Sequence, residues 1–341
     1  MIATTALNAE EPTNINSHSI SQLITTHPRD RLFVHPLTWT ARHLSLLCCR
    51  FFDDGVITIA PLPPTPTTPP ATLPSPPNSV PADDDDAGEL QRYLADINSD
   101  ASAARRLAKC TNSTTRGQAI SQLLREPKYY RDKVHFYFAR RAVAQLPCYL
   151  FSHASQSPSQ PPPLAQLAYL DLSEIAHHRK TKLAGPAPPL GARCRFNTPS
   201  FRRVQKQLRL LTPEDPREDP YIAALLIALA QEQRLYSEGD GNDNNEKNFT
   251  DATSAATPSQ MLLVTRPGGI KWLYIYTSKV SLDFLDGLDR PSRPPPADAP
   301  SRLGMGIYRR RLAFKPYKTL TRRLAAVVRD AGSLGHLVPE I

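Results

Sequence analysis

The sequence predicts an α+β protein that is rich in helix, with a small antiparallel sheet in its C-terminal half and long disordered proline-rich insertions. Three observations support this. Residues 221–230 are an apolar run with a helix-start signal before them, and residues 261–280 contain two β-rich runs around a Pro-Gly-Gly turn. The 35 prolines among 341 residues are about twice the usual ~5% share and are clustered. A compact fold must therefore be built from less than the whole chain.

Low-complexity stretches set the expected organisation of the chain. Residues 61–88 combine dense proline with an aspartate run at 83–86, which is typical of a linker. The expected units are an N-terminal segment 1–60, partly ordered; a disordered linker 61–88; a helical region 89–151 packing on the core; a Pro-rich connecting region 152–198; an α+β core 199–332 with disordered loops 237–259 and 289–302; and a tail 333–341.

The apolar run at 221–230 begins as a well-signalled helix. Asp219 is a good N-cap, and Pro220 occupies the first helical position, where its missing N–H costs nothing. Ten residues of helix rise only ~15 Å, against a hydrocarbon core of ~30 Å. No membrane span is therefore expected here, and the pattern favours a fully buried helix over one that captures a hydrophobic partner.

The hairpin at 261–280 should form the sheet, with residues 271–277 as its central strand. Trp272, Tyr274 and Tyr276 share one face of this strand while Leu273 and Ile275 share the other, so both faces should be covered. A short helix capped by Ser281, a third strand in "MGIYRRRLAF" and a helix in "YKTLTRRLAAVVRD" should follow. The last helix places these residues on one face: Leu320, Leu324, Val327 and Val328.

Upstream of the core the periodicity favours helices. Residues 114–146 suggest two helices broken before Pro127, the second with Tyr130, Val134 and either Tyr137 or Phe138 at helical steps. Residues 199–211 suggest an amphipathic helix with a basic exterior.

Five segments of residues 200–330 resemble a group of uncharacterised proteins from filamentous fungi. They are "DPYIAALLIALAQ" at 219–231, "LLVT" at 262–265, "WLYIYTSKV" at 272–280, "FLDGLDRPSR" at 284–293 and "FKPYKTLTRRL" at 314–324. The resemblance implies a fungal source and one domain with these elements. It implies no activity.

Charge and cysteine usage bear on the compartment. Lys and Arg number 41 against 32 Asp and Glu, a net charge of +9 that allows polyanion contact without requiring it. The N-terminal stretch lacks the basic residues of a secretory or mitochondrial leader, so a cytoplasmic or nuclear location is expected. The odd number of scattered cysteines favours reduced thiols: Cys48, Cys49, Cys110, Cys148 and Cys194.

Patterns that would carry catalysis or a metal are incomplete. Cys48 and Cys49 follow His43 without a second ligand pair, and Glu174 with His178 has no visible third ligand. Asp132 and His135 could orient a general base on a helix surface, but such pairs are common. No metal, cofactor or catalytic residue is predicted.

Two further patterns that would indicate an enzyme are incomplete in the sequence. The Gly304 and Gly306 pair lacks the preceding strand and third glycine of a phosphate-binding loop. A nuclease-like core needs acidic residues on its paired strands, but none occurs in the hairpin between Met261 and Val280, and Glu126 with Lys128 matches only the spacing. Both interpretations are disfavoured.

Residues 302–329 contain nine basic and no acidic residues, with aromatic residues between them. This pattern suggests polyanion binding by phosphate contact. The candidate residues are Arg309, Arg310, Arg311, Lys315, Lys318, Arg322 and Arg323. A solvated surface, pairing within the molecule, a protein partner or a nuclear import signal remain alternatives.

The function favoured by the sequence is that of a non-catalytic interaction or scaffold protein with an unknown protein partner. Nucleic-acid binding through the basic C-terminal strand and helix is one alternative. A degenerate or unrecognised enzyme is the other.

Overall fold

The computed structural model describes residues 19–28, 30, 34–57, 85–125, 128–152, 167–185, 198–239, 260–265, 271–294 and 304–333. Most of the predicted linker 61–88 and of the predicted loops 237–259 and 289–302 lies outside these residues, as do the turn at 267–269, Glu126 and Cys194.

The helices are α1 (Ile20–Thr26), α2 (Ala41–Leu46), α3 (Asp85–Lys109), α4 (Ser113–Leu124), α5 (Leu172–Ala184), α6 (Thr198–Leu211), α7 (Pro220–Gly239), α8 (Leu282–Asp289) and α9 (Leu320–Ser333). Short 3-10 helices are η2 (Pro36–Thr38), η3 (Pro216–Glu218) and η4 (Tyr317–Thr319). The strands are β1 (Cys49–Val56), β2 (Lys128–Phe138), β3 (Arg141–Ser152), β4 (Leu167–Asp171), β5 (Gln260–Thr265), β6 (Trp272–Ser278) and β7 (Met305–Ala313).

The strands form one seven-stranded mixed sheet in the order β1-β7-β6-β5-β4-β3-β2. The pairs β1/β7 and β4/β5 are parallel, and the other neighbours are antiparallel. The chain is therefore α+β as predicted, but the expected small, purely antiparallel sheet of the C-terminal half is wrong. Strand β6 is internal, as expected, whereas the middle position belongs to β5.

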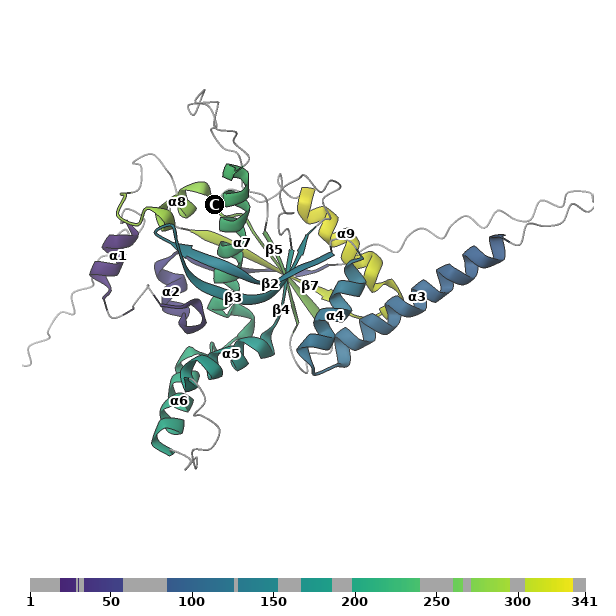
Figure 1. The fold of residues 1–341 in the computed structure, drawn as a ribbon, viewed down its shortest axis with the longest axis horizontal. Coiled ribbons are helices and arrows are strands. Elements are labelled where there is room, and N and C mark those ends of the chain that lie inside the picture. The colour runs from purple at the N-terminus through teal and green to yellow at the C-terminus, as the bar shows by residue number, and fades with distance from the viewer. Residues whose placement is uncertain are drawn as a thin grey trace, which may run out of the picture.

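Two apolar layers cover the sheet (Figure 1). On one face α7 runs across the strands with α1, α2 and α8 beside it, and on the other face lie α3, α4 and α9. Residues 221–230 of α7 are buried throughout, and the Tyr221 N–H donates to Asp219 Oδ1 at 2.9 Å. The prediction of a capped, fully buried helix is thus confirmed.

The C-terminal elements form as the sequence predicts. Strands β5 and β6 pair as an antiparallel hairpin, and Ser281 caps α8 by accepting a hydrogen bond from the Phe284 N–H. On α9, Leu320, Leu324 and Val327 are buried against the sheet, while Val328 is half-buried at the margin.

The predicted second helix of residues 114–146 is wrong, because residues 128–152 form the hairpin β2–β3. Val134, Phe136 and Phe138 alternate into the core with the less buried His135 and Tyr137 between them, which satisfies a two-residue period as well as helical steps. The hairpin turns at Ala139 and Arg140, whose φ angles of 48° and 61° are those of a type I′ turn. That turn usually contains Asn-Gly, so its sequence signal is missing here.

Two further expected boundaries change. The N-terminal segment supplies β1, which pairs with β7 from the opposite end of the chain. The predicted connecting region 152–198 contains β4, which lies beside the middle strand β5, and the helix α5. The sheet thus joins segments that the sequence analysis assigned to separate units.

Candidate functional site: a groove beside the edge strand β1

The strand β1 lies at one end of the sheet and has only β7 as a neighbour among the described strands. The Met305 N–H donates to the Cys48 carbonyl at 3.3 Å, which fixes the alternation of backbone groups along β1. Arg50 and Phe52 therefore turn their backbone groups toward β7. Cys49, Phe51 and Asp53 direct theirs to the outer edge.

The opposite edge of the sheet is closed differently. Gln231 of α7 accepts from the Tyr137 N–H and donates to the Tyr137 carbonyl, both at 2.9 Å, so one side chain satisfies both backbone groups of this residue of β2. Next to the turn, the Ala139 N–H donates to the Leu288 carbonyl of α8 at 2.9 Å. Edge strands are often covered in this way to prevent unwanted pairing.

A groove of about 840 Å³ lies next to β1. Its lining comes from α2, from β1 and from the segment 213–218 that joins α6 to α7. The lining residues are Ala41, Leu44, Cys49, Arg50, Phe51, Phe52, Pro213, Glu214, Asp215, Pro216, Arg217 and Glu218. Sites for ligands typically occupy ~300–1,000 Å³.

Arg309 of β7 forms the charged centre beneath this groove. Its residue is only 5% exposed, and its Nη2 donates to Asp53 Oδ2 at 3.0 Å. Its Nη1 lies 3.8 Å from Asp215 Oδ2 and 3.7 Å from Glu218 Oε1, beyond hydrogen-bond distance. The buried Nε and Nη1 atoms make no hydrogen bond with the described residues.

The segment 213–218 is held over Arg309 by its own contacts. Arg217 Nε donates to both carboxylate oxygens of Asp215 at 2.9 Å, and the Tyr276 hydroxyl donates to the Arg217 carbonyl at 2.8 Å. Burial alone would raise the pKa of Asp215, but the hydrogen bonds and charge of Arg217 outweigh it and lower that pKa. The hydrogen bond from Arg309 likewise lowers the pKa of Asp53. Both carboxylates are therefore ionised at neutral pH.

The groove combines an apolar floor with a rim on which two glutamates outnumber the exposed Arg50. Leu44, Cys49 and Phe51 belong to the core layer of this face, and Phe51 packs edge-on against Tyr276. Glu214 and Glu218 are exposed, and neither lies within hydrogen-bond distance of a described cation. Such a surface suits a ligand with apolar and basic groups close together.

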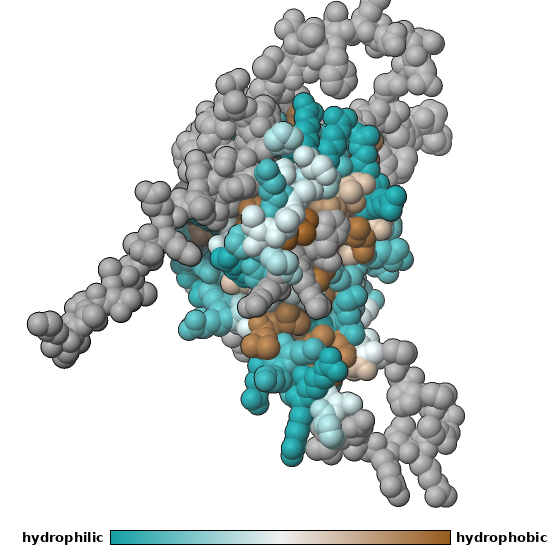
Figure 2. Space-filling model, turned by 90° about the vertical axis from the view of Figure 1, so that its left-hand side faces the viewer, coloured by the Kyte–Doolittle hydropathy of each residue, from teal (hydrophilic) through white to brown (hydrophobic). Residues whose placement is uncertain are grey.

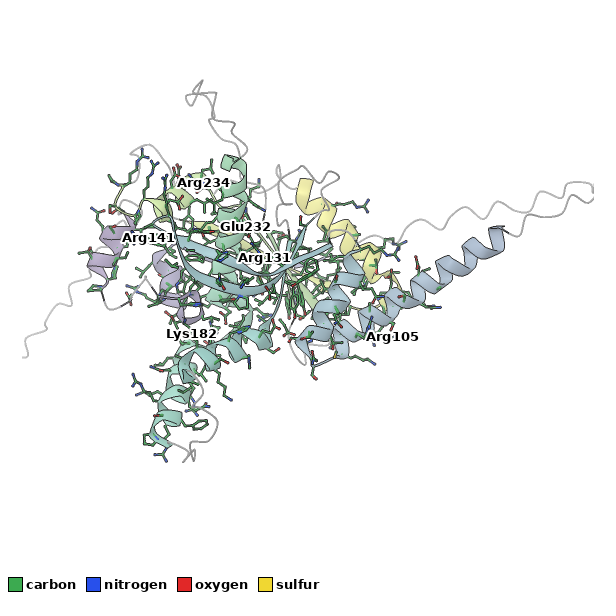
Figure 3. All side chains as sticks on the ribbon, viewed as in Figure 1. Arg105, Arg131, Arg141, Lys182, Glu232 and Arg234 are labelled. Carbon is green, nitrogen blue, oxygen red and sulfur yellow. The ribbon has the colours of Figure 1, made fainter. Side chains whose placement is uncertain are left out.

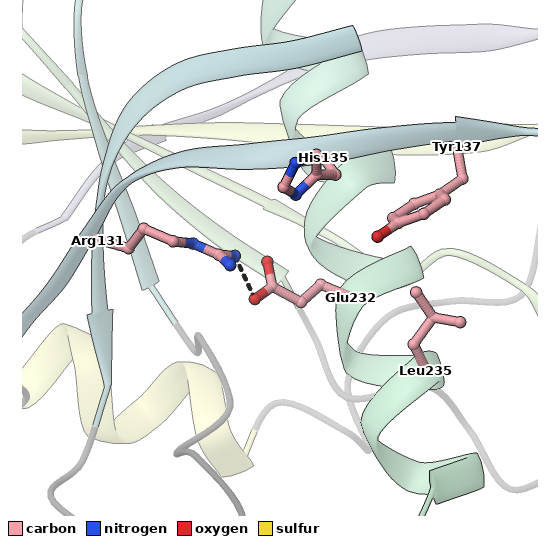
Figure 4. A pocket seen from close by; sticks show the side chains of 5 residues that line it. All are labelled: Arg131, His135, Tyr137, Glu232 and Leu235. Carbon is pink, nitrogen blue, oxygen red and sulfur yellow. Dashed lines mark hydrogen bonds and ion pairs between the residues drawn. The ribbon is translucent and has the colours of Figure 1, made fainter. Parts of the chain in front are cut away.

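A second cavity, of about 160 Å³, lies where β2 crosses α7 (Figure 3). Arg131, His135 and Tyr137 come from β2, and Glu232 and Leu235 from α7 (Figure 4). Arg131 forms an ion pair with Glu232, whose pKa is raised by burial despite the opposing charge of Arg131.

This cavity lacks an assembled acid–base pair. His135 Nε2 bonds to the amide of Gln145 at 3.2 Å, and the Glu232 carboxylate is engaged by Arg131. General acid–base catalysis needs the two groups within reach of one reacting proton. The predicted Asp132 and His135 pair is also separated, because residues three apart on a strand point to opposite faces.

The carboxyl ends of the parallel strands β4 and β5, where open α/β sheets often bind ligands, are filled in this protein. Asp171 ends β4, caps α5 and forms an ion pair with Arg116 of α4 at 2.8 Å. Arg116 also donates to Thr265 at the end of β5 at 3.3 Å. Both charged groups are buried, at 2% and 0% exposure, so they tie α4 to the sheet and leave no opening there.

The residues predicted to bind polyanions separate into two groups. Arg309 is buried under the groove, Arg311 lies over the Trp272 ring at 5.8 Å, and Arg310 points to the opposite face of the sheet. Arg323 donates to the carbonyls of residues 313, 314 and 316, so it serves the fold. Lys315, Lys318 and Arg322 are exposed.

A fourth cation, which was not among the residues predicted to bind polyanions, lies on the same surface as the three exposed residues. Arg105 of α3 lies over the ring of Tyr317 at 5.9 Å, next to Lys318 in the sequence (Figure 3). We call Arg105, Lys315, Lys318 and Arg322 the Tyr317 patch. None of them forms an ion pair with a described carboxylate. Arg105 can be identified as a member of this patch only from the packing of α3 on η4, which no local sequence pattern indicates.

The other sequence candidates remain separate. His43 caps α2 through a hydrogen bond from the Thr40 N–H to Nδ1 at 3.1 Å and stacks on Trp39, while Cys49, Cys110 and Cys148 are free thiols. Within the described residues, no group of three or more His, Cys, Asp or Glu side chains could hold a metal ion. Among the described helices, none has the length and apolar character needed to cross a membrane.

Comparison with known proteins gives no match: no family model, no curated protein and no solved structure is similar to this chain. The resemblance to fungal proteins stays a prediction.

Proposed function

We propose that this protein is a non-catalytic interaction protein that binds a short extended segment of a partner polypeptide in the groove beside β1. The observation that carries the proposal is the groove itself, whose volume falls within the range of ligand sites while its lining holds no acid–base or nucleophile pair. Extended peptides commonly bind beside exposed sheet edges, where backbone groups are available.

The charges of the groove define the partner segment. Arg309 and Arg217 neutralise Asp53 and Asp215, whereas Glu214 and Glu218 outnumber the exposed Arg50 and leave the lining with a negative charge. Apolar side chains of the partner would rest on Leu44 and Phe51. Basic side chains would lie against the rim, because unlike charges across an interface favour binding and reject acidic competitors.

Fluorescence anisotropy with labelled peptides tests this proposal. A peptide of about five residues in which leucine alternates with lysine should bind, and the same peptide with glutamate in place of lysine should bind at least about tenfold more weakly. The double substitution Glu214→Lys and Glu218→Lys should reverse that preference. Asp132→Lys on the far strand β2 is the matched control and should leave both affinities unchanged. Equal binding of the two peptides, or an unchanged preference in the double variant, would reject the proposal.

A second candidate function, polyanion binding, is favoured by the Tyr317 patch. Its four cations come from two distant segments of the chain, α3 and residues 315–322, and none has an ion-pair partner among the described residues. Clusters of this kind bind phosphates in a salt-dependent way. Replacing Arg105, Lys318 and Arg322 by Ser should lower the salt concentration at which the protein leaves a heparin column, whereas Arg42→Ser, on α2, should not. Identical elution of all the variants would exclude this function.

A further inference from the structure

The outer edge of β1 is complementary to itself. We propose that two copies of this chain pair through their β1 strands, antiparallel and in one register, so that the two seven-stranded sheets become continuous. This interface uses the same edge of β1 that borders the groove, so the dimer and a peptide bound along β1 should exclude each other.

Backbone geometry restricts the register. Across an antiparallel pair, residues whose backbone groups point outward must oppose one another. On β1 these are Cys49, Phe51 and Asp53. A two-fold axis through Phe52 places Phe51 of one copy opposite Asp53 of the other, and the reverse, so each pair can exchange two hydrogen bonds.

The side chains of β1 are also compatible with a two-fold axis through Phe52. Phe52 stacks on Tyr308 of β7 with ring centroids 5.3 Å apart and planes 22° apart, which leaves its other ring face directed off the sheet edge. The axis brings the second Phe52 to that free face. The result is a ladder of four aromatic rings, and aromatic pairs across neighbouring strands are stabilising.

The charges complete the match. Strand alternation puts Arg50, Phe52 and Asp54 on one face, so the axis through Phe52 sets Arg50 of each copy opposite Asp54 of the other. Both charged residues are exposed, and neither forms an ion pair with another described residue. Two unlike-charge pairs would therefore form across the interface.

Neighbouring registers fit less well. A shift in one direction opposes the two Asp53 carboxylates, and a shift in the other sets Arg50 against Phe52. Pairing cannot extend beyond Asp54, because Gly55 has a φ of +83° at a bulge and its N–H donates to the Asp53 side chain at 3.1 Å. With so few residues paired, the dimer should be weak and concentration-dependent.

Sedimentation velocity of the full chain, from micromolar to near-millimolar concentration, measures the dimer. Wild type should shift from monomer to dimer within this range. Arg50→Asp and Asp54→Arg should each weaken association at least about tenfold, because each creates two like-charge contacts across the axis. The double variant carrying both changes should restore it. A wild type that stays monomeric, single variants that associate as wild type does, or a double variant that is not rescued would each overturn the proposal.

A cross-linking measurement tests the axis itself. The two Phe52 residues would oppose each other without exchanging backbone hydrogen bonds. The Cα atoms of such a pair lie ~4.5 Å apart, which is within the range of a disulfide. Phe52→Cys should therefore form a covalent dimer under mild oxidation. Val143→Cys, a more exposed site on β3, and wild type with its own thiols should not. Equal cross-linking of Val143→Cys and Phe52→Cys would show that the contact is not at this axis and would overturn the proposal.

Discussion

Several arginines of this protein are buried and paired with carboxylates from distant segments. Arg179 of α5 is the most completely satisfied: it donates to both oxygens of Asp219 at 2.6 and 2.7 Å and to the Leu37 carbonyl at 2.8 Å. Because removing charges from water is costly, such pairs add less stability than their short distances suggest. Their effect is to fix which segments meet, here α5, the start of α7 and η2.

His35 should make stability depend on pH. Its Nδ1 accepts a hydrogen bond from the Leu37 N–H at 3.2 Å, and burial, aided by the charge of Lys182, lowers its pKa from 6.5 to about 4. A protonated ring could not accept that bond. Between about pH 6.5 and 4 the unfolded chain therefore binds more protons than the folded one, and stability falls as pH falls.

The measurement is urea unfolding of wild type and His35→Asn at several pH values in that window. Asn keeps a cap acceptor but does not titrate. Wild type should lose stability relative to the variant below about pH 6.5, and the two should keep a constant difference above it. A difference that is constant across the window would show that His35 is not held neutral by the fold.

At the scale of elements, α4 packs closely on β3. A Cβ atom placed on Gly117 would lie 2.8 Å from the ring of Tyr149, so the helix approaches the strand only because this residue has no side chain. In an exposed helix, Gly→Ala typically gains ~0.5–1 kcal/mol. Gly117→Ala should instead destabilise the protein by about 1–3 kcal/mol, because Tyr149 must move.

A double-mutant cycle separates this clash from other effects. In a Tyr149→Ala background the ring is absent, and Gly117→Ala should then be stabilising. Chemical denaturation of the four proteins gives the coupling energy. Additive effects of the two substitutions would mean that α4 and β3 are not in contact at this point.

Elements with local signals could be predicted from the sequence, and those defined by distant partners could not. The helix α7 has a cap, a first-position proline and an unbroken apolar run, and the hairpin β5–β6 has turn residues. The strand β2 has no such local signal. Its buried residues fit both the helical period and the two-residue period of a strand, and Ala139 and Arg140 are not typical turn residues. The pattern of residues 128–146 therefore predicts a helix where the structure has a hairpin.

The candidate site was less predictable than the fold. The groove is assembled from three segments, and Arg309 was expected on a surface because its partner Asp53 lies 256 residues away in sequence. No local pattern carries that contact. The part of the basic surface that remains exposed, Lys315, Lys318 and Arg322, could be identified from the sequence alone.

At the scale of the molecule, the sheet makes the chain ends depend on each other. The N-terminal β1 closes the sheet against the C-terminal β7, and Trp39 of the N-terminal segment packs edge-on against Phe136 of β2. The surface over α1, α2 and α8 is mainly hydrophilic, with its apolar side chains in small patches (Figure 2). The apolar contacts of the N-terminal segment are thus mostly turned inward, toward the shared core.

This arrangement predicts that the described elements unfold as one cooperative unit. The chain has two tryptophans: Trp39 in the N-terminal segment is buried in the core layer of the α7 face, and the half-buried Trp272 of the hairpin packs against that same layer. In Trp39→Phe and Trp272→Phe, fluorescence reports only the remaining tryptophan. In each variant the fluorescence midpoint in urea should coincide with that from circular dichroism, as two-state unfolding requires. If the variant that retains Trp39 lost fluorescence at lower urea than its circular dichroism changed, the N-terminal segment would unfold before the rest of the sheet. β1 could not then be an integral strand.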